Sequence, residues 1–273
     1  MSNILKNKID FAIIISVKNA NPNGDPLNGN RPRINYDGYG EISDVALKRK
    51  IRNRLLDRGC NVLMQTSDYK NDKYLSIKDR YDNNERIKAD KGNKNAEKKA
   101  EIACKEWIDV RTFGQVLAGV DDVSASIAIR GPLSIQSAFS VEPVNSTSIQ
   151  ITKSMNTTTN DKKGSDTMGM KHRIDFGIYL TYGSIVPQLA SKTGFTEEDV
   201  KQIKEAMRTL FENDATSARP SGSMEVLKLI WWEQKEGEKV VSSAKIHRSL
   251  KVNQDGTYTL DNTGVNVEEI DGI

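Results

Sequence analysis

The hydrophobic positions of this chain follow strand-like and helix-like periods in turn. Residues 11–17 are an apolar run with β-branched side chains at successive positions, which predicts a central strand covered on both faces. Residues 43–58 carry apolar side chains at helical spacing, with Ser43 as a plausible N-cap and Gly59 as a natural stop. This stripe, which predicts an amphipathic helix, consists of Leu47, Ile51 and Leu55.

The rest of the chain repeats these two periods. Helical spacing returns in residues 95–107 and again from Thr196 to Leu210, where Thr196 and Asp199 have capping-box spacing. Alternating stretches predict strands in residues 124–130, 133–141, 174–180 and 224–232. Because Gly131 and Pro132 turn the chain between the first two, we expect these two strands to form a β-hairpin or a bent strand pair.

This order of elements predicts an α+β fold. Without insertions it is close to β-α-β-β-α-β, a ferredoxin-like sheet with two helices on one face, which RNA-recognition (RRM) domains share. Residues 1–64, 101–144 and 172–250 would form this RRM-like palm core. No Lys/Arg-Gly-Phe/Tyr-Gly-Phe motif occurs, so stacking of bases on the sheet face is not predicted.

Three stretches fall outside the predicted core. Residues 65–100 have little apolar periodicity and predict an exposed insertion or a partly disordered loop. Residues 145–171 are rich in Thr and Ser and predict a flexible β-hairpin that projects from the body. Residues 251–273 are acidic, and we expect a loose solubilising end or a contact with the basic face of a neighbouring copy.

Charge distribution says more than net charge, which is +3 over 273 residues. The first 60 residues hold 11 Lys and Arg against 6 Asp and Glu, which indicates an anionic partner near the N-terminal half. No apolar run approaches the ~20 residues of a membrane span, and the N-terminus lacks a signal-peptide layout, so cytoplasmic residence without a membrane partner is predicted. Cys60 and Cys104 are expected to be free thiols.

The most distinctive stretch is residues 21–33, with three prolines, two glycines and four asparagines, which predict a shaped loop. Its backbone amides, with Arg31 and Arg33, have the chemistry to grip an anion. Six Lys and Arg follow within residues 48–58. One interpretation is a site for a phosphate backbone, and the other is a solvated turn before a salt-bridged helix face. For the first we expect Lys48, Arg49 and Arg52 to be the contacts, since they lie on one edge beside the apolar stripe.

An ordered set of blocks resembles one protein family. After the apolar strand come Asn21-Pro22-Asn23-Gly24-Asp25-Pro26, Pro32-Arg33 and Ser43-Asp44-Val45-Ala46-Leu47-Lys48-Arg49-Lys50-Ile51-Arg52. Later blocks are Asp109-Val110-Arg111-Thr112-Phe113-Gly114, Arg130-Gly131-Pro132 and Thr167-Met168-Gly169-Met170-Lys171. These resemble the Cas-seven family, the repeated backbone subunit of Cascade-type CRISPR complexes. The block Phe211-Glu212-Asn213-Asp214-Ala215 through Ser217-Ala218-Arg219 resembles the subtype I-C branch (Csd-two type).

The resemblance implies a protein that binds CRISPR guide RNA (crRNA) in antiviral defense and presents it for pairing with target DNA. It also implies copies stacked head-to-tail, Cas-five-type and Cas-eight-type partner subunits, and a thumb-like hairpin at 145–171. Met155, Met168 and Met170 would be apolar wedges against a base, or would pack the foot of the hairpin. The RNA-binding residues predicted in this way are Asn23, Gly24, Asp25, Arg31, Arg33, Lys48, Arg49, Arg52, Lys153, Met155, Met168 and Lys171.

The sequence argues against an enzyme. His172 and His247 lie in no metal-ligand or nucleophile motif, and we predict no metal, no cofactor and no catalytic residue. Two alternatives stay open. Four carboxylates, Asp25, Asp37, Glu41 and Asp44, are near each other in sequence and could serve a metal-dependent RNase of the type III backbone class, although each also suits a turn or helix start. The other alternative is a generic oligomer that binds single-stranded RNA.

Overall fold

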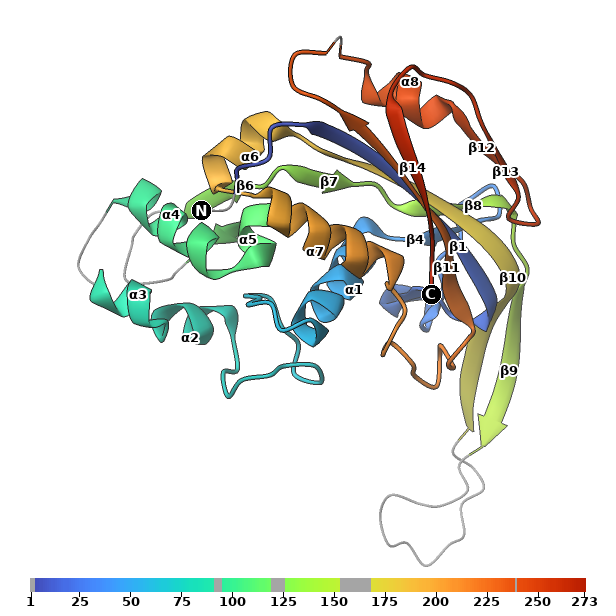
Figure 1. The fold of residues 1–273 in the computed structure, drawn as a ribbon. Helices are drawn as coiled ribbons and strands as arrows, with labels where there is room; N and C mark the ends of the chain where they lie inside the picture. The colour runs from blue at the N-terminus through green and yellow to red at the C-terminus, as the bar shows by residue number, and fades with distance from the viewer. Residues whose placement is uncertain (1–2, 91–94, 119–125, 153–167, 239) are drawn as a thin grey trace, which may run out of the picture.

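The centre of the protein is a large antiparallel sheet. The computed structural model describes residues 3–90, 95–118, 126–152, 168–238 and 240–273. Strands lie in the order β14-β11-β1-β10-β8-β4, and β7 and β9 also pair with β10 (Figure 1). These strands are β1 Lys8–Ala20, β4 Tyr39–Ile42, β7 Leu133–Ile135, β8 Ala138–Pro143, β9 Ser146–Thr152, β10 Met168–Ile185, β11 Met224–Gln234 and β14 Asn266–Asp271. The fold is therefore mixed α+β, as the sequence predicts.

Strand β1 is buried on both faces, which confirms the interpretation of the apolar run. Phe11, Ile13 and Ile15 belong to the core formed with α1 Asp44–Asp57 and α7 Glu197–Arg208. Ala12 belongs to a smaller core on the other face, which Ile246 of α8 Ser243–Arg248 helps to form. Each large apolar side chain buried in this way contributes roughly 1.5–3 kcal/mol to the stability of the fold. Because both faces of β1 are covered, this strand contributes to both cores.

The two main helices begin where the sequence predicts. The Ser43 hydroxyl accepts a hydrogen bond from the Ala46 amide at 3.3 Å at the start of α1. Thr196 and Asp199 form the predicted capping box at the start of α7. Such caps satisfy amides that have no partner inside the helix, and they fix the depth at which each helix packs on the sheet.

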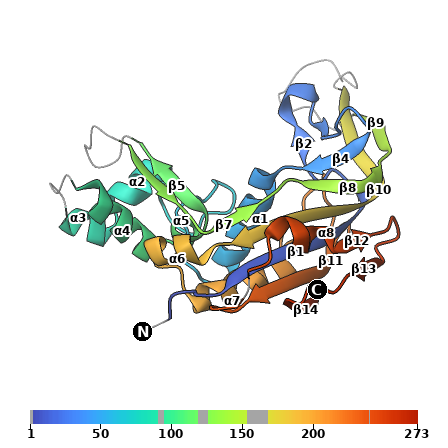
Figure 2. The ribbon, with the colours of Figure 1, turned by 90° about the horizontal axis from the view of Figure 1, so that it is seen from above.

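The described residues between 63 and 130 form a second lobe with its own core, which the expectation of an exposed insertion or a partly disordered loop at 65–100 did not include. The lobe contains α2 Ile77–Asp82, α3 Glu85–Ala89, α4 Ala96–Glu106, α5 Ile108–Phe113, β5 Gly114–Leu117 and β6 Ile127–Arg130. Tyr81 and Ile87 are buried against Ala103 and Trp107. Ala103 and Trp107 lie in or next to α4, which the helical spacing of residues 95–107 predicts, whereas Tyr81 and Ile87 lie on α2 and α3, which are too short to give a periodic run. Figure 2 shows the lobe at one end of the sheet and β4, β9 and the short strand β2 Gly24–Asp25 at the other.

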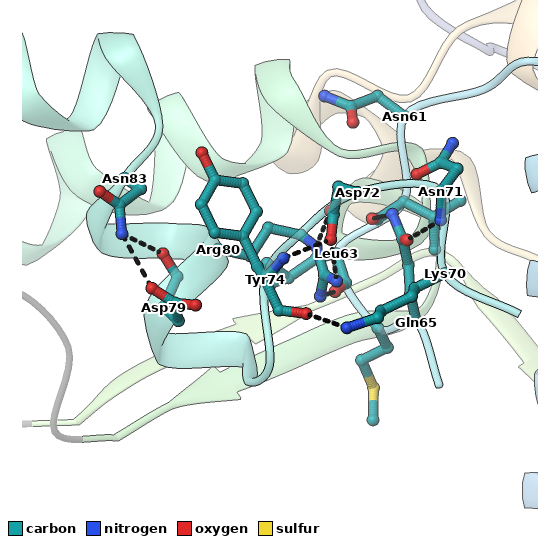
Figure 3. A network of polar contacts seen from close by, with 12 residues as sticks. Asn61, Leu63, Gln65, Lys70, Asn71, Asp72, Tyr74, Asp79, Arg80 and Asn83 are labelled. Carbon is teal, nitrogen blue, oxygen red and sulfur yellow. Dashed lines mark hydrogen bonds and ion pairs between the residues drawn. The ribbon is translucent and has the colours of Figure 1, made fainter. Parts of the chain in front are cut away.

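A polar network orders the start of this lobe (Figure 3). The buried Arg80 guanidinium donates to both carboxylate oxygens of Asp72, at 2.5 and 2.9 Å, and to the Leu63 carbonyl at 2.6 Å. Gln65 accepts from the Asn71 amide at 3.1 Å and donates to the Val62 carbonyl at 2.8 Å. Bidentate Arg–carboxylate pairs are among the stronger polar contacts. Polar contacts therefore order this segment, which has few apolar side chains to bury.

The predicted hairpin between residues 124–130 and 133–141 is wrong. Strand β6 pairs with β5, whereas β7 and β8 join β10 in the main sheet. The reason is the close approach of two glycines: a Cβ on Gly114 would collide with the Ile129 carbonyl, and one on Gly131 would collide with the Thr112 carbonyl. The turn at Gly131 therefore carries the chain from one sheet to another.

Two further segments differ from expectation. The tail is not a loose end: after β12 Leu250–Val252 and β13 Tyr258–Leu260, strand β14 pairs with β11 at the sheet edge. Its carboxylates Glu268 and Asp271 each lie 2.6 Å from a lysine of the body, Lys204 and Lys228 respectively. Phe176, expected to be buried in its strand, is 50% exposed, and it lines a surface groove with Val141, Pro143 and Asp255. Helix α6 Pro187–Thr193 was not predicted.

Candidate nucleic-acid interface

The loop at residues 21–33 has regular secondary structure. It contains β2 Gly24–Asp25, a 3-10 turn at Pro26–Asn28 and β3 Arg31–Pro32. The Asn23 side-chain oxygen accepts hydrogen bonds from the Ser43 amide at 2.9 Å and the Ser43 hydroxyl at 2.8 Å, which joins the loop to the first turn of α1. A Cβ on Gly24 would collide with the Asn30 side-chain oxygen, so a larger residue there would displace the Asn30 side chain. Asn23 and Gly24 thus set the shape of the loop.

One groove, which we name the hairpin-side groove, lies between this loop and the start of β9. Its volume is about 260 Å³, and its lining includes Asp25, Arg31, Arg33, Glu41 and Ser146. Arg31 is exposed, whereas the Arg33 Nη2 lies 3.7 Å from Asp25 Oδ1. Asp25 Oδ1 also accepts from the Leu27 amide at 3.2 Å. Three predicted site residues, Asp25, Arg31 and Arg33, therefore meet here.

The foot of the β9–β10 hairpin lies at the same end of the sheet. Met168 and Met170 are 62% and 54% exposed, so neither packs into the foot, and Lys171 is exposed as well. In the register, Lys171 pairs with Ile149 and Met170 pairs with Gln150, so the lysine and the methionines occupy opposite faces of the ribbon. Lys153 and Met155 lie outside the described residues.

The cations of α1 are mostly neutralised within the protein. Lys48 lies 2.9 Å from Asp44, Arg49 lies 3.5 Å from Asp68, and Lys50 pairs with Asp214. Arg54 pairs with Asp57, and Arg58 donates to Gln202. The interpretation of a salt-bridged helix face is thus correct for much of this helix, and Lys48 and Arg49 keep the most exposed partners among the predicted contacts.

Arg52 is the predicted contact that the structure places inside the fold. It is 8% exposed, its Nε donates to Asp109 Oδ2 at 3.1 Å, and its guanidinium lies 4.8 Å from the Phe113 ring centre. Asp109 also accepts from the backbone amides of Leu63 at 2.8 Å and Met64 at 3.0 Å. We therefore leave Arg52 out of the proposed contacts.

A second groove, the helix-side groove, lies over α1 on the other side of the loop. Its volume is about 460 Å³, and its lining includes Pro22, Asn23, Gly24, Arg49, Lys50, Asn53, Asp68, Tyr69, Asn213, Asp214, Thr216 and Arg219. Burial lowers the pKa of Lys50 to about 8, against the opposing effect of Asp214. Sequence reasoning singled out the block at residues 211–219 but gave it no role; here Asp214 binds both Lys50 and Arg219.

Two of the four carboxylates considered for metal catalysis are in ion pairs, Asp44 with Lys48 and Asp25 with Arg33. Glu41 lines the hairpin-side groove, and Asp37 lies in a turn in which its backbone amide donates to the Asn35 side-chain oxygen. Within the described part of the chain, no three His, Cys, Asp or Glu side chains gather in a way that would hold a metal ion. His172 Nδ1 lies 2.8 Å from the Ser148 hydroxyl, and His247 stacks on Tyr182 with ring centres 4.7 Å apart. Both histidines therefore have structural contacts.

Comparison with known proteins gives consistent results. A family model described as CRISPR-associated protein Cas7 matches residues 7–270. A protein of Haloferax volcanii described as CRISPR-associated protein Cas7 is 27% identical over 236 residues, which cover 79% of this chain and 67% of that protein. None of the described helices is both long and apolar enough to span a bilayer.

Solved structures share the fold. A chain described as CRISPR RNA-guided surveillance complex, pre-nicking, aligns with a TM-score of 0.52 and 15% identity, covering 88% of this chain and 81% of that one. A second, described as CRISPR RNA-guided surveillance complex, aligns with a TM-score of 0.50 and 16% identity over 92% and 77% of the two chains. At such identities the likeness concerns the fold alone.

Proposed function

The chain belongs to the family described as CRISPR-associated protein Cas7, and from this premise we propose that it is a guide-RNA-binding backbone subunit of a surveillance complex of the Cascade type, subtype I-C. The two structural relatives come from complexes described as RNA-guided. The subtype rests on the resemblance of the block at residues 211–219 to the I-C branch, and the Asp214 and Arg219 of this block line the helix-side groove.

The observation that carries this proposal is the pair of grooves on either side of one loop. Pro22, Asn23 and Gly24 line the helix-side groove, whereas the loop residues that line the hairpin-side groove are Asp25, Asn28, Arg31, Pro32, Arg33 and Ile34. Each groove contains guanidinium groups, which bind phosphate oxygens in a fork geometry. A single strand that crosses the loop would therefore meet cations on both sides, which suits a protein that follows a backbone rather than reading bases.

We propose Arg31, Arg33 and Lys171 as backbone contacts on the hairpin side, and Lys48 and Arg49 on the helix side. Asn23 and Gly24 position the loop, and Asp25 orients Arg33 through the 3.7 Å ion pair. Met168 and Met170 offer exposed, adaptable apolar surface for a base beside the strand.

The proposed assembly follows from binding along a strand. Copies of this chain would stack head-to-tail, a heterologous contact that does not close. Cas-five-type and Cas-eight-type subunits and target DNA would complete the complex, with recognition left to base pairing. We further propose that β11-β1-β10-β8 with α1 and α7 is the RRM-like core, since this order has the first strand between the fourth and third. Cytoplasmic residence stays a prediction.

The first test is whether the protein purifies with RNA. At low salt we expect a high ratio of absorbance at 260 to 280 nm and large particles that shrink after RNase treatment. RNA that is cut in magnesium but stays intact with a chelator would instead favour the RNase alternative. A monomer free of nucleic acid, which binds guide-derived and unrelated RNA equally weakly, would contradict the proposal.

The second test assigns the hairpin-side cations. In the double variant Arg31→Gln, Lys171→Gln, the negative slope of log affinity against log salt should become shallower by roughly 1.4, because each of the two lost phosphate contacts accounts for about 0.7 on a single strand. The double variant Lys192→Gln, Lys201→Gln is the matched control, since it removes two exposed lysines, on α6 and α7, that lie outside both grooves. An unchanged slope in the Arg31→Gln, Lys171→Gln variant, or an equal change in the control, would refute the assignment.

A further inference from the structure

The ion pair between Arg49 and Asp68 differs from the buried pairs of α1. The Asp214 and Asp109 side chains that hold Lys50 and Arg52 are 15% and 1% exposed. The Asp68 side chain is 80% exposed, and its Oδ1 lies 3.5 Å from Arg49 Nη2. Exposed pairs at this distance contribute little to stability, so the fold does not depend on this contact.

Arg49 is nevertheless held in position without Asp68. Its Nε donates to the Asn53 side-chain oxygen at 3.0 Å, and its Nη2 donates to the Thr66 hydroxyl. These two contacts fix the plane of the guanidinium within the lining of the helix-side groove. A fixed fork loses less freedom when it binds an anion, which is the geometry that Arg offers to carboxylates and phosphates alike.

Asp68 presents a carboxylate to that fork from a neighbouring segment. The Tyr69 amide donates to the Thr66 carbonyl at 3.1 Å, which forms a tight turn that carries Asp68. The Thr66 hydroxyl, and to a smaller extent Arg49, keep the pKa of Asp68 below its usual value, so the group stays negatively charged at neutral pH. The free protein therefore already has an anion at Arg49.

We propose that Asp68 is an internal stand-in for phosphate: it occupies Arg49 in the free protein, and a backbone phosphate of the bound strand replaces it. The inference rests on the proposed function and adds a residue that sequence reasoning did not identify. The groove of about 460 Å³ beside Arg49 has room for a phosphodiester group. Asp68 therefore lowers the affinity of the helix-side groove for a polyanion and leaves the hairpin-side groove unaffected.

The experiment is a double-mutant cycle on RNA binding. Wild type, Asp68→Asn, Arg49→Gln and the double variant are titrated with a labelled, unstructured single-stranded RNA over a range of salt concentrations. Asp261→Asn is the matched control, because it makes the same charge change on an exposed carboxylate of the tail. Thermal unfolding of each variant shows that it is folded.

We expect Asp68→Asn to bind RNA roughly two- to five-fold more tightly than wild type, the factor that corresponds to an exposed ion pair. The gain should vanish in the Arg49→Gln background and be smaller in Asp261→Asn. A gain of equal size in the Arg49→Gln background or in the control would show a general charge effect and overturn the inference. Unchanged or weaker binding by Asp68→Asn would also overturn it, while RNA binding by the wild type would leave the proposed function intact. Failure of every variant, wild type included, to bind RNA would refute the proposed function itself.

Discussion

Replacing Arg52 with methionine should lower stability without changing RNA binding. Methionine keeps an unbranched apolar stem over the Phe113 ring but removes the charge that pairs with Asp109. At 3.1 Å and an effective dielectric constant of about 20, the gross Coulomb attraction is about 5 kcal/mol. Loss of one partner of a buried pair usually costs about 3–5 kcal/mol. Because two backbone amides still bind the Asp109 carboxylate, we expect a loss of about 3 kcal/mol.

The assay is equilibrium unfolding in urea, with Lys48→Met as the control. Lys48 and Asp44 have side chains 26% and 38% exposed, so breaking their pair should cost less than about 0.5 kcal/mol. RNA binding by the refolded Arg52→Met protein should keep the wild-type salt slope. A stability change below about 1 kcal/mol, together with a slope reduced by about 0.7, would show that Arg52 faces the strand and that our reasoning from burial is wrong.

Three other predictions follow from particular residues. The unfolded chain keeps the Lys50 proton up to the ordinary value of 10.5, whereas the folded protein releases it near its pKa of about 8. The unfolded state therefore binds more protons between these pH values, so the free energy of unfolding of the wild type should gain a contribution that rises with pH over this window. Lys50→Met lacks this contribution, so the difference between the wild-type and variant pH profiles should rise over the same window, and a flat difference would refute the pKa assignment. Gly114→Ala should lower stability by more than about 2 kcal/mol in urea unfolding, since its φ is 79° and a Cβ would collide with the Ile129 carbonyl; an unaffected midpoint would refute the close approach. Phe176→Ala should cost less than about 1 kcal/mol, whereas Ile178→Ala, at a side chain 3% exposed, should cost about 2–5 kcal/mol; equal losses would contradict the exposure of Phe176.

The sheet and its main helices could be predicted because their signals are local. The apolar run of β1, the stripe of α1 and the capping box of α7 each lie within one short window of sequence. The lobe could be predicted only in part: the periodic runs 95–107 and 124–130 correspond to α4 and β6, whereas α2 and α3 left no such signal. Its core joins Tyr81 and Ile87 to Trp107 across several short helices, and its order depends on contacts such as Arg80 with Asp72.

The sequence identified most of the residues of the candidate site but not how they are arranged in space. The loop and its arginines were found because prolines, glycines and asparagines mark a shaped turn. The role of each cation was beyond sequence reasoning, because it depends on distant carboxylates: Asp109 lies 57 positions from Arg52, and Asp214 lies 164 positions from Lys50. Such pairing decides which cations are free to bind a strand.

Helix α5 has a consequence for how the protein opens. Its Ile108 belongs to the sheet core and its Val110 to the lobe core, while Asp109 and Arg111 bind Arg52 of α1 and Asp199 of α7. Two cores joined through a polar seam tend to behave as separate cooperative units in native-state hydrogen exchange. The lobe would then exchange its amides through a partial opening that leaves β1, β10 and β11 protected, and α5 would report both events.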